Sequence, residues 1–370
     1  MIDNRRHRIR DWFLRFDWPL LAVVSLLCGM GLVNLKSAAA HSRVAFHVTQ
    51  SVWLAAGVVI VILIAAVHTR VFIRGAYLFY GAVIALLLAV ALVGTELNAS
   101  QRWLNLGFFM MQPSELLKLA VILVTARFFH EKNREGSYGL FELWRPFLLV
   151  GIGVAFVMKQ PDLGTSLVIL AIFMTMVLFE GVRWESLVGL AVAVIIAMPV
   201  AYNFVLQDYQ RNRVASYLNI EADAQGQSWQ VRQSLIAFGS GRMWGKGKEE
   251  GTQIQKGFVP EHENDFIAAN WAEERGFAGM IFLLMVYLAF VICALNVARR
   301  ATDRFGVHIG VGVAALFFWH VVVNLGMVTG VLPVVGLTLP LMSYGGSSLL
   351  TMLVGVGLLL NVSVHRPRYG

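Results

Sequence analysis

Ten hydrophobic runs, each about as long as a bilayer crossing, constrain the fold of this chain more than any other feature. A membrane-spanning helix needs roughly 20 consecutive, mostly apolar residues. The runs cover residues 18–35, 48–67, 76–94, 114–130, 145–159, 163–180, 185–206, 266–298, 306–331 and 346–364. Hydrophobic residues make up 58% of the chain and charged residues 14%, which is not the balance of a soluble domain. The sequence therefore predicts an all-α integral membrane protein with ten transmembrane helices.

The distribution of Lys and Arg predicts the orientation of these helices. Cytoplasmic loops of membrane proteins carry an excess of these residues. If the N-terminus is cytoplasmic, seventeen Lys and Arg residues lie at the cytoplasmic ends of the spans, and only four lie at the short outer ends. Both termini are therefore expected in the cytoplasm. The long loop at 207–264, between spans seven and eight, is expected to be extracytoplasmic.

Residues 1–370 are expected to form a single polytopic domain with 207–264 as its large outer loop. The basic start leads into a full-length span, so no cleaved signal peptide is predicted. Cys28 and Cys293 both lie inside apolar runs, and no disulfide framework is implied. The net charge of +8 follows the membrane topology, which gives no reason to expect nucleic acid as a partner. The run that begins at 266 is too long for one straight crossing, and Gly276 is the expected point of division.

Asp265 stands where the long polar loop meets the eighth hydrophobic run. A carboxylate at a membrane rim is costly to hold, and such residues usually serve a function. Glu273 and Glu274 follow on about the same helical face. Lys118 or Arg275 could neutralise them, and a structural role is favoured for both.

Three further polar clusters are expected at the same depth as Asp265. The first runs from Gln112 to Lys118, with Glu115 and Lys118 one helical turn apart. The second runs from Gln160 to Ser166 and places Asp162 near the positive end of a helix. The third, from Pro333 to Ser348, breaks the chain between the last two spans. Each alone could be a helix cap or a structural ion pair, but together they predict a site.

The polar loop offers two further features. Residues 228–238 alternate apolar and polar side chains in a way that suits a short helix on the membrane surface. Residues 239–247 are rich in glycine and carry Arg242 and Lys246. Such a segment can present amides and ammonium groups to phosphate, although its spacing is not that of a nucleotide-binding P-loop. A solvated loop with incidental charge is the alternative.

Several segments together resemble the SEDS family of bacterial peptidoglycan glycosyltransferases. They are Gln101–Gly107, Gln112–Lys118, Gln160–Ser166, Asp208–Arg213, Gly245–Gly247, Pro260–Gly276 and Asn324–Ser348. The segment from Asn324 to Gly336 is most similar to the cell-elongation member, RodA. One departure is that His262, Glu263 and Asn264 stand where the family often has a His-Thr pair before the aspartate.

The resemblance implies that the chain polymerises lipid II into glycan strands at the outer face of the bacterial cytoplasmic (inner) membrane. Asp265 is the expected general base for an inverting displacement of polyprenyl diphosphate. The expected substrate-binding residues are Arg102, Glu115, Lys118, Asp162, Arg211, Arg213 and Lys246. Glu115 would hold Lys118 in place. Asp162 would orient a cation or bind a divalent metal such as Mg²⁺ or Mn²⁺, but one or two carboxylates do not identify a metal site.

The resemblance also implies a partner, because the chain has no Ser-x-x-Lys motif in a folded outer module that could cross-link peptides. That partner would be a class B penicillin-binding protein. Its helix is expected to pack against small residues of the later spans, Gly310, Gly312 and Ala314 or Gly355 and Gly357. Two other functions remain open, namely a flippase or transporter of lipid-linked precursor and a non-catalytic scaffold. The scattered histidines are given no metal role, and tryptophans near span ends, such as Trp53 and Trp103, are interpreted as interfacial anchors.

Overall fold

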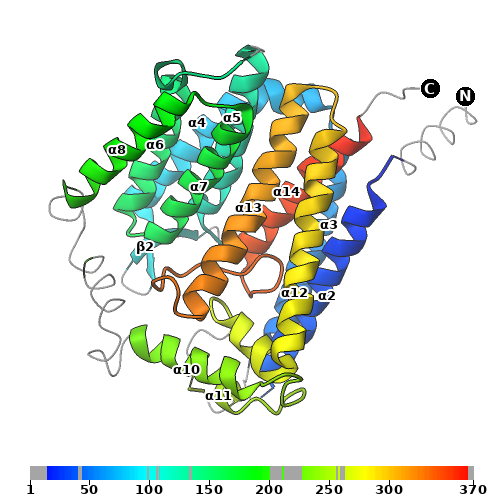
Figure 1. The fold of residues 1–370 in the computed structure, drawn as a ribbon. Coiled ribbons are helices and arrows are strands. Elements are labelled where there is room, and N and C mark those ends of the chain that lie inside the picture. Colours follow the sequence, from blue (N-terminus) through cyan, green and yellow to red (C-terminus); the bar gives the residue numbers. More distant parts are fainter. Residues whose placement is uncertain are drawn as a thin grey trace, which may run out of the picture.

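The computed structural model is a bundle of long helices with a small sheet and a layer of short helices at one end (Figure 1). It describes residues 15–40, 44–97, 100–105, 107, 109–132, 136–200, 211, 227–255, 257–258 and 263–365. The long helices are α2 (Trp18–Ala38), α3 (Phe46–Ala66), α4 (Thr69–Val93), α5 (Pro113–Lys132), α6 (Trp144–Lys159), α7 (Leu163–Glu180), α8 (Trp184–Val200), α12 (Ile267–Arg299), α13 (Arg304–Val328) and α14 (Gly346–Val364). Each predicted hydrophobic run thus lies at least partly in a helix.

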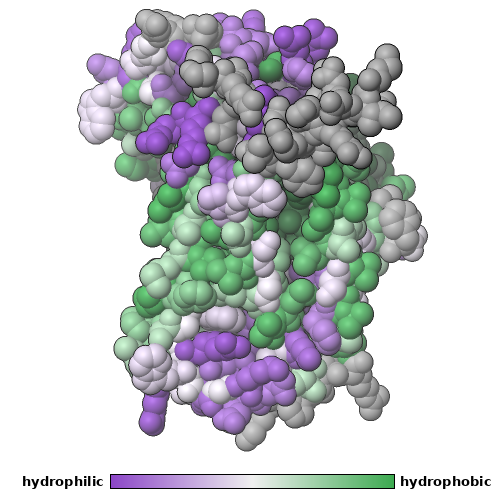
Figure 2. All heavy atoms as spheres, turned by 90° about the vertical axis from the view of Figure 1, so that its right-hand side faces the viewer, coloured by the Kyte–Doolittle hydropathy of each residue, from purple (hydrophilic) through white to green (hydrophobic). Residues whose placement is uncertain are grey.

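Eight of the described helical segments are long and apolar enough to cross a membrane. The other two long helices fall outside this group: α5 carries Glu115 and Lys118, and α8 is described over 17 residues. The count of ten spans therefore stays a prediction. Figure 2 shows a hydrophobic band across the face that forms the right-hand side of Figure 1, with polar residues at both ends of it. The band agrees with exposed apolar side chains on α3 and α12, such as Val52 and Phe277.

The helices α5, α13 and α14 form the centre of the bundle. Almost every residue of α5 from its start to Phe129 is buried, and α14 is the most buried of the eight candidate spans. Near the opposite ends of the chain, Arg15 and α14 are joined, because Ser363 Oγ donates to the Arg15 carbonyl at 3.0 Å. The two ends of the described chain therefore lie at the same end of the bundle (Figure 1).

The small residues predicted to receive a partner helix are occupied by this chain's own side chains. A Cβ atom on Gly310 would meet Ala298 of α12, and one on Gly312 would meet Ile122 of α5. Gly355 faces Val313, and Gly357 faces Ile64 of α3. That expectation was wrong, because these residues allow the chain's own helices to approach each other closely.

A three-stranded antiparallel sheet precedes α5. Its strands are β1 (Thr95–Leu97), β2 (Ser100–Asn105) and β3 (Met110–Met111), in the order β1-β2-β3. The pattern of hydrophobic runs did not predict this sheet, which carries Arg102 and Trp103 on β2. A 3₁₀ turn (Leu140–Leu143) leads into α6 at the other end of the bundle.

Two shorter helices lie across the same end of the bundle as the sheet, α10 (Gln227–Ser240) and α11 (Thr252–Gln255) (Figure 1). The helix expected at 228–238 is thus confirmed as α10. Its Ser234 Oγ donates to the Val328 carbonyl at the end of α13, at 2.8 Å. This bond fixes α10 against the bundle.

The division of α12 at Gly276 is also confirmed. Gly276 has φ 66° and ψ −164°, a conformation that is essentially restricted to glycine, and it interrupts an otherwise helical run. The chain between α13 and α14 is non-helical, as the Pro333–Ser348 segment predicted. Both breaks lie at the end of the bundle that holds the sheet.

Candidate active site

All four predicted polar clusters contribute to one cavity of about 690 Å³, which we call the Asp265 cavity. Its lining includes Arg102, Glu115, Asp162 and Asp265 from the predicted site. The remaining lining residues are Thr49, Trp53, Trp103, Phe109, Met110, Gln112, Thr165, Asn264, Val335, Gly336, Leu337, Thr338, Tyr344, Gly345, Gly346, Ser347 and Ser348. Segments more than two hundred residues apart in the sequence therefore meet at the breaks between helices.

Asp265 lies in a turn directly before α12, and its backbone is anchored by α13. The buried side chain of Asn324 donates from Nδ2 to the Asp265 carbonyl at 2.8 Å and to the Leu337 carbonyl at 2.6 Å. Gly336 has φ +70°, and a Cβ atom there would lie 3.3 Å from Asp265 Oδ2. Asn324 thus fixes the depth of Asp265, and Gly336 leaves room beside its carboxylate.

Arg102 and Asp162 also line the cavity. Arg102 donates from Nε to the Gln160 carbonyl at 2.8 Å and from Nη2 to the Pro161 carbonyl, and its Nη1 lies 4.0 Å from Asp162 Oδ2. Asp162 caps α7, since its Oδ1 accepts from Thr165 N at 3.1 Å. Its position at a positive helix end is confirmed. Its Oδ2 accepts from Gln112 Nε2 at 3.1 Å, so both of its oxygens are engaged.

Glu115 and Lys118 form a buried ion pair on α5. The Lys118 ammonium lies 2.6 Å from Glu115 Oε1 and 2.9 Å from His320 Nε2 on α13, and its side chain is 0% exposed. His320 Nδ1 lies 3.1 Å from the Thr338 carbonyl, which can only accept. Nδ1 therefore carries the proton, and Nε2 accepts from Lys118. The network joins α5 and α13 to the Thr338 segment of the cavity wall.

Within this pair, Glu115 rather than Lys118 faces the Asp265 cavity. Glu115 is a lining residue, whereas Lys118 is not. Glu115 Oε2 is buried and has no hydrogen-bond partner among the residues the structure describes. The 2.6 Å contact agrees with the expectation that Glu115 holds Lys118 in place, and Lys118 itself is not a lining residue of the cavity.

The glycine-rich segment 239–247 is inserted into the break of α12. Lys246 N and Gly247 N donate to the Glu273 and Glu274 carbonyls, at 3.0 and 3.2 Å. The amides of Phe277 and Ala278 donate to the Arg242 and Met243 carbonyls, at 2.8 and 3.0 Å. The expectation that these loop amides would face phosphate was wrong, because they satisfy the backbone groups that the break leaves unpaired.

Lys246 lies beside Glu273 and is not a lining residue of the Asp265 cavity. Its ammonium is 2.6 Å from Glu273 Oε1, which also accepts from Thr252 N at 2.8 Å. Glu274 accepts from Ser37 Oγ and, at 3.0 Å, from Glu249 N. These contacts agree with the structural role favoured for the two glutamates. Lys118 does not neutralise them, because it pairs with Glu115. The Arg275 guanidinium lies over the Trp271 ring at 4.9 Å, and its charge also interacts with the Glu274 carboxylate.

The remaining two predicted substrate-binding residues are Arg211 and Arg213. Arg211 is not among the lining residues of the Asp265 cavity. Arg213 lies outside the described residues, as does His262 before Asp265.

The described side chains do not fit a metal site built by the protein alone. They include no group of three or more His, Cys, Asp or Glu residues that could hold an ion. Both oxygens of Asp162 already accept hydrogen bonds from the chain. A Mg²⁺ or Mn²⁺ ion would therefore need most of its ligands from elsewhere.

Several residues of the site could not be recognised as such from the sequence. Trp53 and Trp103, interpreted as interfacial anchors, line the cavity, and Trp53 lies 5.3 Å from Phe109 between ring centroids. His320 was one scattered histidine among several. Asn324, in contrast, lies in a motif of the SEDS resemblance, and a buried amide in an apolar helix is a usable signal.

Comparison with known proteins identifies the family. A family model described as the cell cycle protein family FtsW/RodA/SpoVE matches residues 17–368. The chain belongs to this family. Together with the eight apolar helices, this membership makes it a multi-pass protein of the bacterial inner membrane.

Individual relatives agree with this result over nearly their full length. The chain is 39% identical over 319 residues to the peptidoglycan glycosyltransferase MrdB of Escherichia coli (strain K12), covering 85% of this chain and 84% of MrdB. It is 34% identical over 359 residues to the probable peptidoglycan glycosyltransferase FtsW of Trichlorobacter lovleyi, covering 94% of this chain and 93% of that FtsW.

Solved structures share the same fold. One is a chain from a structure on the coordination of polymerization and crosslinking by a peptidoglycan synthase complex. It matches with a TM-score of 0.81 and 34% identity, covering 95% of this chain and 98% of that chain. The rod shape determining protein RodA of Thermus thermophilus matches with a TM-score of 0.71 and 30% identity, covering 95% of this chain and 98% of that RodA chain.

Proposed function

We propose that this chain is a peptidoglycan glycosyltransferase that polymerises lipid II for cell elongation and shape. The observation that carries this proposal is the cavity that brings Asp265, Arg102 and Glu115 together at one end of a membrane bundle. The similarity to MrdB and RodA supports a role in elongation. The activity of the named relatives supports the reaction class.

Asp265 acts as the general base in a single displacement. The hydroxyl oxygen of the acceptor sugar attacks the anomeric carbon of the donor, and the bond from that carbon to the diphosphate oxygen breaks. The hydroxyl proton passes to the Asp265 carboxylate, and the electron pair leaves with the polyprenyl diphosphate. Attack opposite the leaving group inverts the anomeric carbon. A diphosphate is a good leaving group, so one carboxylate is sufficient for the proton transfer.

Arg102 stabilises the charge that develops on the diphosphate. Its guanidinium lines the cavity, and arginine suits bidentate contact with phosphate oxygens. The Glu115 carboxylate, which lines the cavity, accepts a hydrogen bond from the substrate, and the buried Lys118 ammonium pairs with it and fixes its charge and position. Asp162 orients Arg102. Arg211 and Arg213 remain candidates for further diphosphate contacts, and no step is assigned to Lys246 or to a metal ion.

The membrane arrangement in this proposal is ten spans, both termini in the cytoplasm and the 207–264 loop outside. The whole of 1–370 acts as one membrane domain. A class B penicillin-binding protein supplies the cross-linking step, by analogy with the synthase complex in which a similar chain occurs.

The decisive experiment is polymerisation by the purified chain. Detergent-solubilised protein with lipid II should form glycan polymer, and Asp265→Asn, with its normal partner present, should not. Detergent abolishes the two compartments that a flippase needs, so polymer formed under these conditions separates the enzyme from a transporter. Wild-type activity in a well-folded Asp265→Asn protein would refute the assignment of the base.

A further inference from the structure

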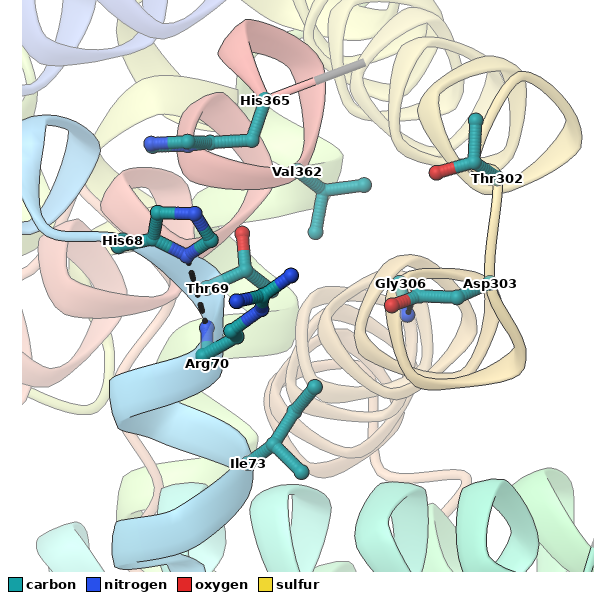
Figure 3. A pocket seen from close by; sticks show the side chains of 9 residues that line it. All are labelled: His68, Thr69, Arg70, Ile73, Thr302, Asp303, Gly306, Val362 and His365. Atoms are coloured by element: carbon teal, nitrogen blue, oxygen red, sulfur yellow. Dashed lines mark hydrogen bonds between the residues drawn. The ribbon is translucent and has the colours of Figure 1, made fainter. Parts of the chain in front are cut away.

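A second cavity, of about 170 Å³, lies at the end of the bundle opposite Asp265. It is lined by His68, Thr69, Arg70, Ile73, Thr302, Asp303, Gly306, Val362 and His365, and Figure 3 shows these side chains. The helix α14 begins beside the Asp265 cavity and ends at this one, and its 19 residues separate the two by about 28 Å. We call it the Arg70 cavity.

The Arg70 guanidinium, the cationic group of this cavity, has no partner among the residues the structure describes. The Arg70 side chain is exposed, and its guanidinium makes no hydrogen bond or ion pair with the residues the structure describes. In Figure 3 it lies between His68 and Asp303. Asp303, the one carboxylate in the lining, extends in Figure 3 toward the side of Arg70, and its Oδ1 accepts from Gly306 N at the start of α13, at 2.8 Å.

The hydrogen bonds of the neighbouring groups show which donors face the cavity. His68 Nδ1 accepts from Arg70 N at 3.3 Å at the start of α4, so in the neutral ring the proton is on Nε2. Thr69 Oγ1 donates to Asn361 Oδ1 at 2.9 Å, and His365 Nδ1 lies 3.0 Å from the Asn361 carbonyl. Thr69 and His365 thus line the cavity with these groups already bonded to Asn361. Arg70 and His68 retain donors for a ligand.

The dimensions and chemistry of the cavity suit an oxyanion. Its volume corresponds to about six water molecules, enough for a phosphate group but not for a sugar nucleotide. The positive end of α4, which has no acidic residue in its first turn, adds to the field of Arg70. Phosphate is the anion that this combination of guanidinium, N–H donor and helix terminus recognises.

Apolar surface beside the cavity indicates a lipid as the source of the phosphate. Ile73 and Val362 form part of the lining, and Val71 on the next position of α4 is 57% exposed. The cavity also lies where the chain turns between α3 and α4, at a boundary between apolar helices and polar chain. Basic pockets between helices at such a boundary hold anionic lipid headgroups.

We propose that the Arg70 cavity binds the phosphodiester of an anionic phospholipid, with Arg70 and His68 as its donors and the acyl chains along the apolar surface of α4. The site is separate from the glycosyltransferase cavity, and lipid binding there would not depend on glycosyltransferase activity. It would fix this end of the bundle in the anionic leaflet.

The test is lipid retention by the purified full-length chain, measured by native mass spectrometry. Phosphatidylglycerol, phosphatidylcholine and inorganic phosphate are added separately. We expect retention of phosphatidylglycerol over phosphatidylcholine, and Arg70→Gln should weaken this retention by about fivefold or more, the effect of one arginine near an anionic surface. Arg183→Gln, at the same end of the bundle but outside the cavity, is the matched control and should retain the lipid.

A second variant separates binding from folding. His68→Asn keeps a side chain that can cap α4 while it removes the Nε2 donor. It should weaken phosphatidylglycerol retention and leave the thermal unfolding of the protein unchanged. Equal retention in wild type, Arg70→Gln and His68→Asn would overturn the proposal. Retention of inorganic phosphate alone would overturn the assignment to a lipid.

Discussion

Replacing Lys118 with methionine removes an ammonium group that is 0% exposed and leaves the Glu115 carboxylate, 7% exposed, without its counter-ion. His320 Nε2 loses its donor at the same time. Breaking a buried ion pair by removing one partner costs about 3–5 kcal/mol, because a buried charge remains uncompensated. Replacing both partners with neutral residues of similar size costs much less. We therefore expect Lys118→Met to be strongly destabilised and Glu115→Gln/Lys118→Met to unfold close to wild type.

The same pair of variants tests whether Glu115 faces the substrate. If the Glu115 carboxylate accepts a hydrogen bond from lipid II, the double variant loses a charged hydrogen bond worth about 1.5–3 kcal/mol, or about tenfold to hundredfold in activity. Thermal unfolding and glycan polymerisation are measured on both proteins. We expect stability to return in the double variant while polymerisation stays low.

A control pair lies at the other end of the bundle. Arg304 Nη1 and Glu180 Oε1 are also 2.6 Å apart, and Glu180 also contacts a histidine, His308. Glu180→Gln/Arg304→Met should leave the polymerisation kinetics unchanged. If Glu115→Gln/Lys118→Met is folded and its kinetics match wild type, the pair has no substrate role.

Four further predictions concern the site and its supports. Asp265→Asn should lower polymerisation by about 10²–10⁴-fold, the usual contribution of a general base, with unfolding unchanged; a smaller effect in single-turnover assays would contradict that role. Asn324→Leu removes the donor of two carbonyls and should cost about 1–3 kcal/mol for each acceptor left buried, and polymerisation should fall with it; unchanged thermal unfolding would contradict this. Gly276→Ala should destabilise the fold by about 2 kcal/mol or more, because the new Cβ would overlap the Gly245 nitrogen and the backbone conformation suits glycine. If thermal unfolding of this variant is unchanged, the break in α12 can move to another residue. Asp162→Asn should leave Mn²⁺ binding to the substrate-free chain unchanged by calorimetry, because both Asp162 oxygens are already engaged; lost binding would place an ion there.

The features that the sequence predicted correctly depend on local rules. Hydrophobic runs form helices in a membrane whatever packs against them, and Asp162 caps α7 because it directly precedes it. The breaks at Gly276 and Pro333–Ser348 follow from residues that interrupt a helix at their own positions. Because these breaks come at one end of the bundle, the meeting of their polar groups in the Asp265 cavity was also predictable.

The features that the sequence did not predict depend on which distant segments meet. Lys118 contacts His320, 202 positions away, and nothing near either residue indicates the other. The segment around Gly245 contacts the break in α12, and the amides that follow Gly245 donate to the Glu273 and Glu274 carbonyls instead of to a ligand. The sequence does not indicate which helix packs against Gly312, and in the structure Ile122 of α5 does so.

The carboxylates at the Asp265 end of the bundle differ in how far the chain itself engages them. Both oxygens of Asp162 accept from Gln112 and Thr165, and Glu273 is surrounded by Lys246 and the amides that start α11. These charges are compensated within the fold, as buried charges must be. Glu115 differs, because it lines the cavity and its buried Oε2 has no hydrogen-bond partner among the described residues. Asp265 differs in another way: the chain fixes its backbone through Asn324, and Gly336 keeps space beside its carboxylate. A fold that anchors the main chain and leaves room at the side chain is the arrangement that proton transfer to a substrate requires.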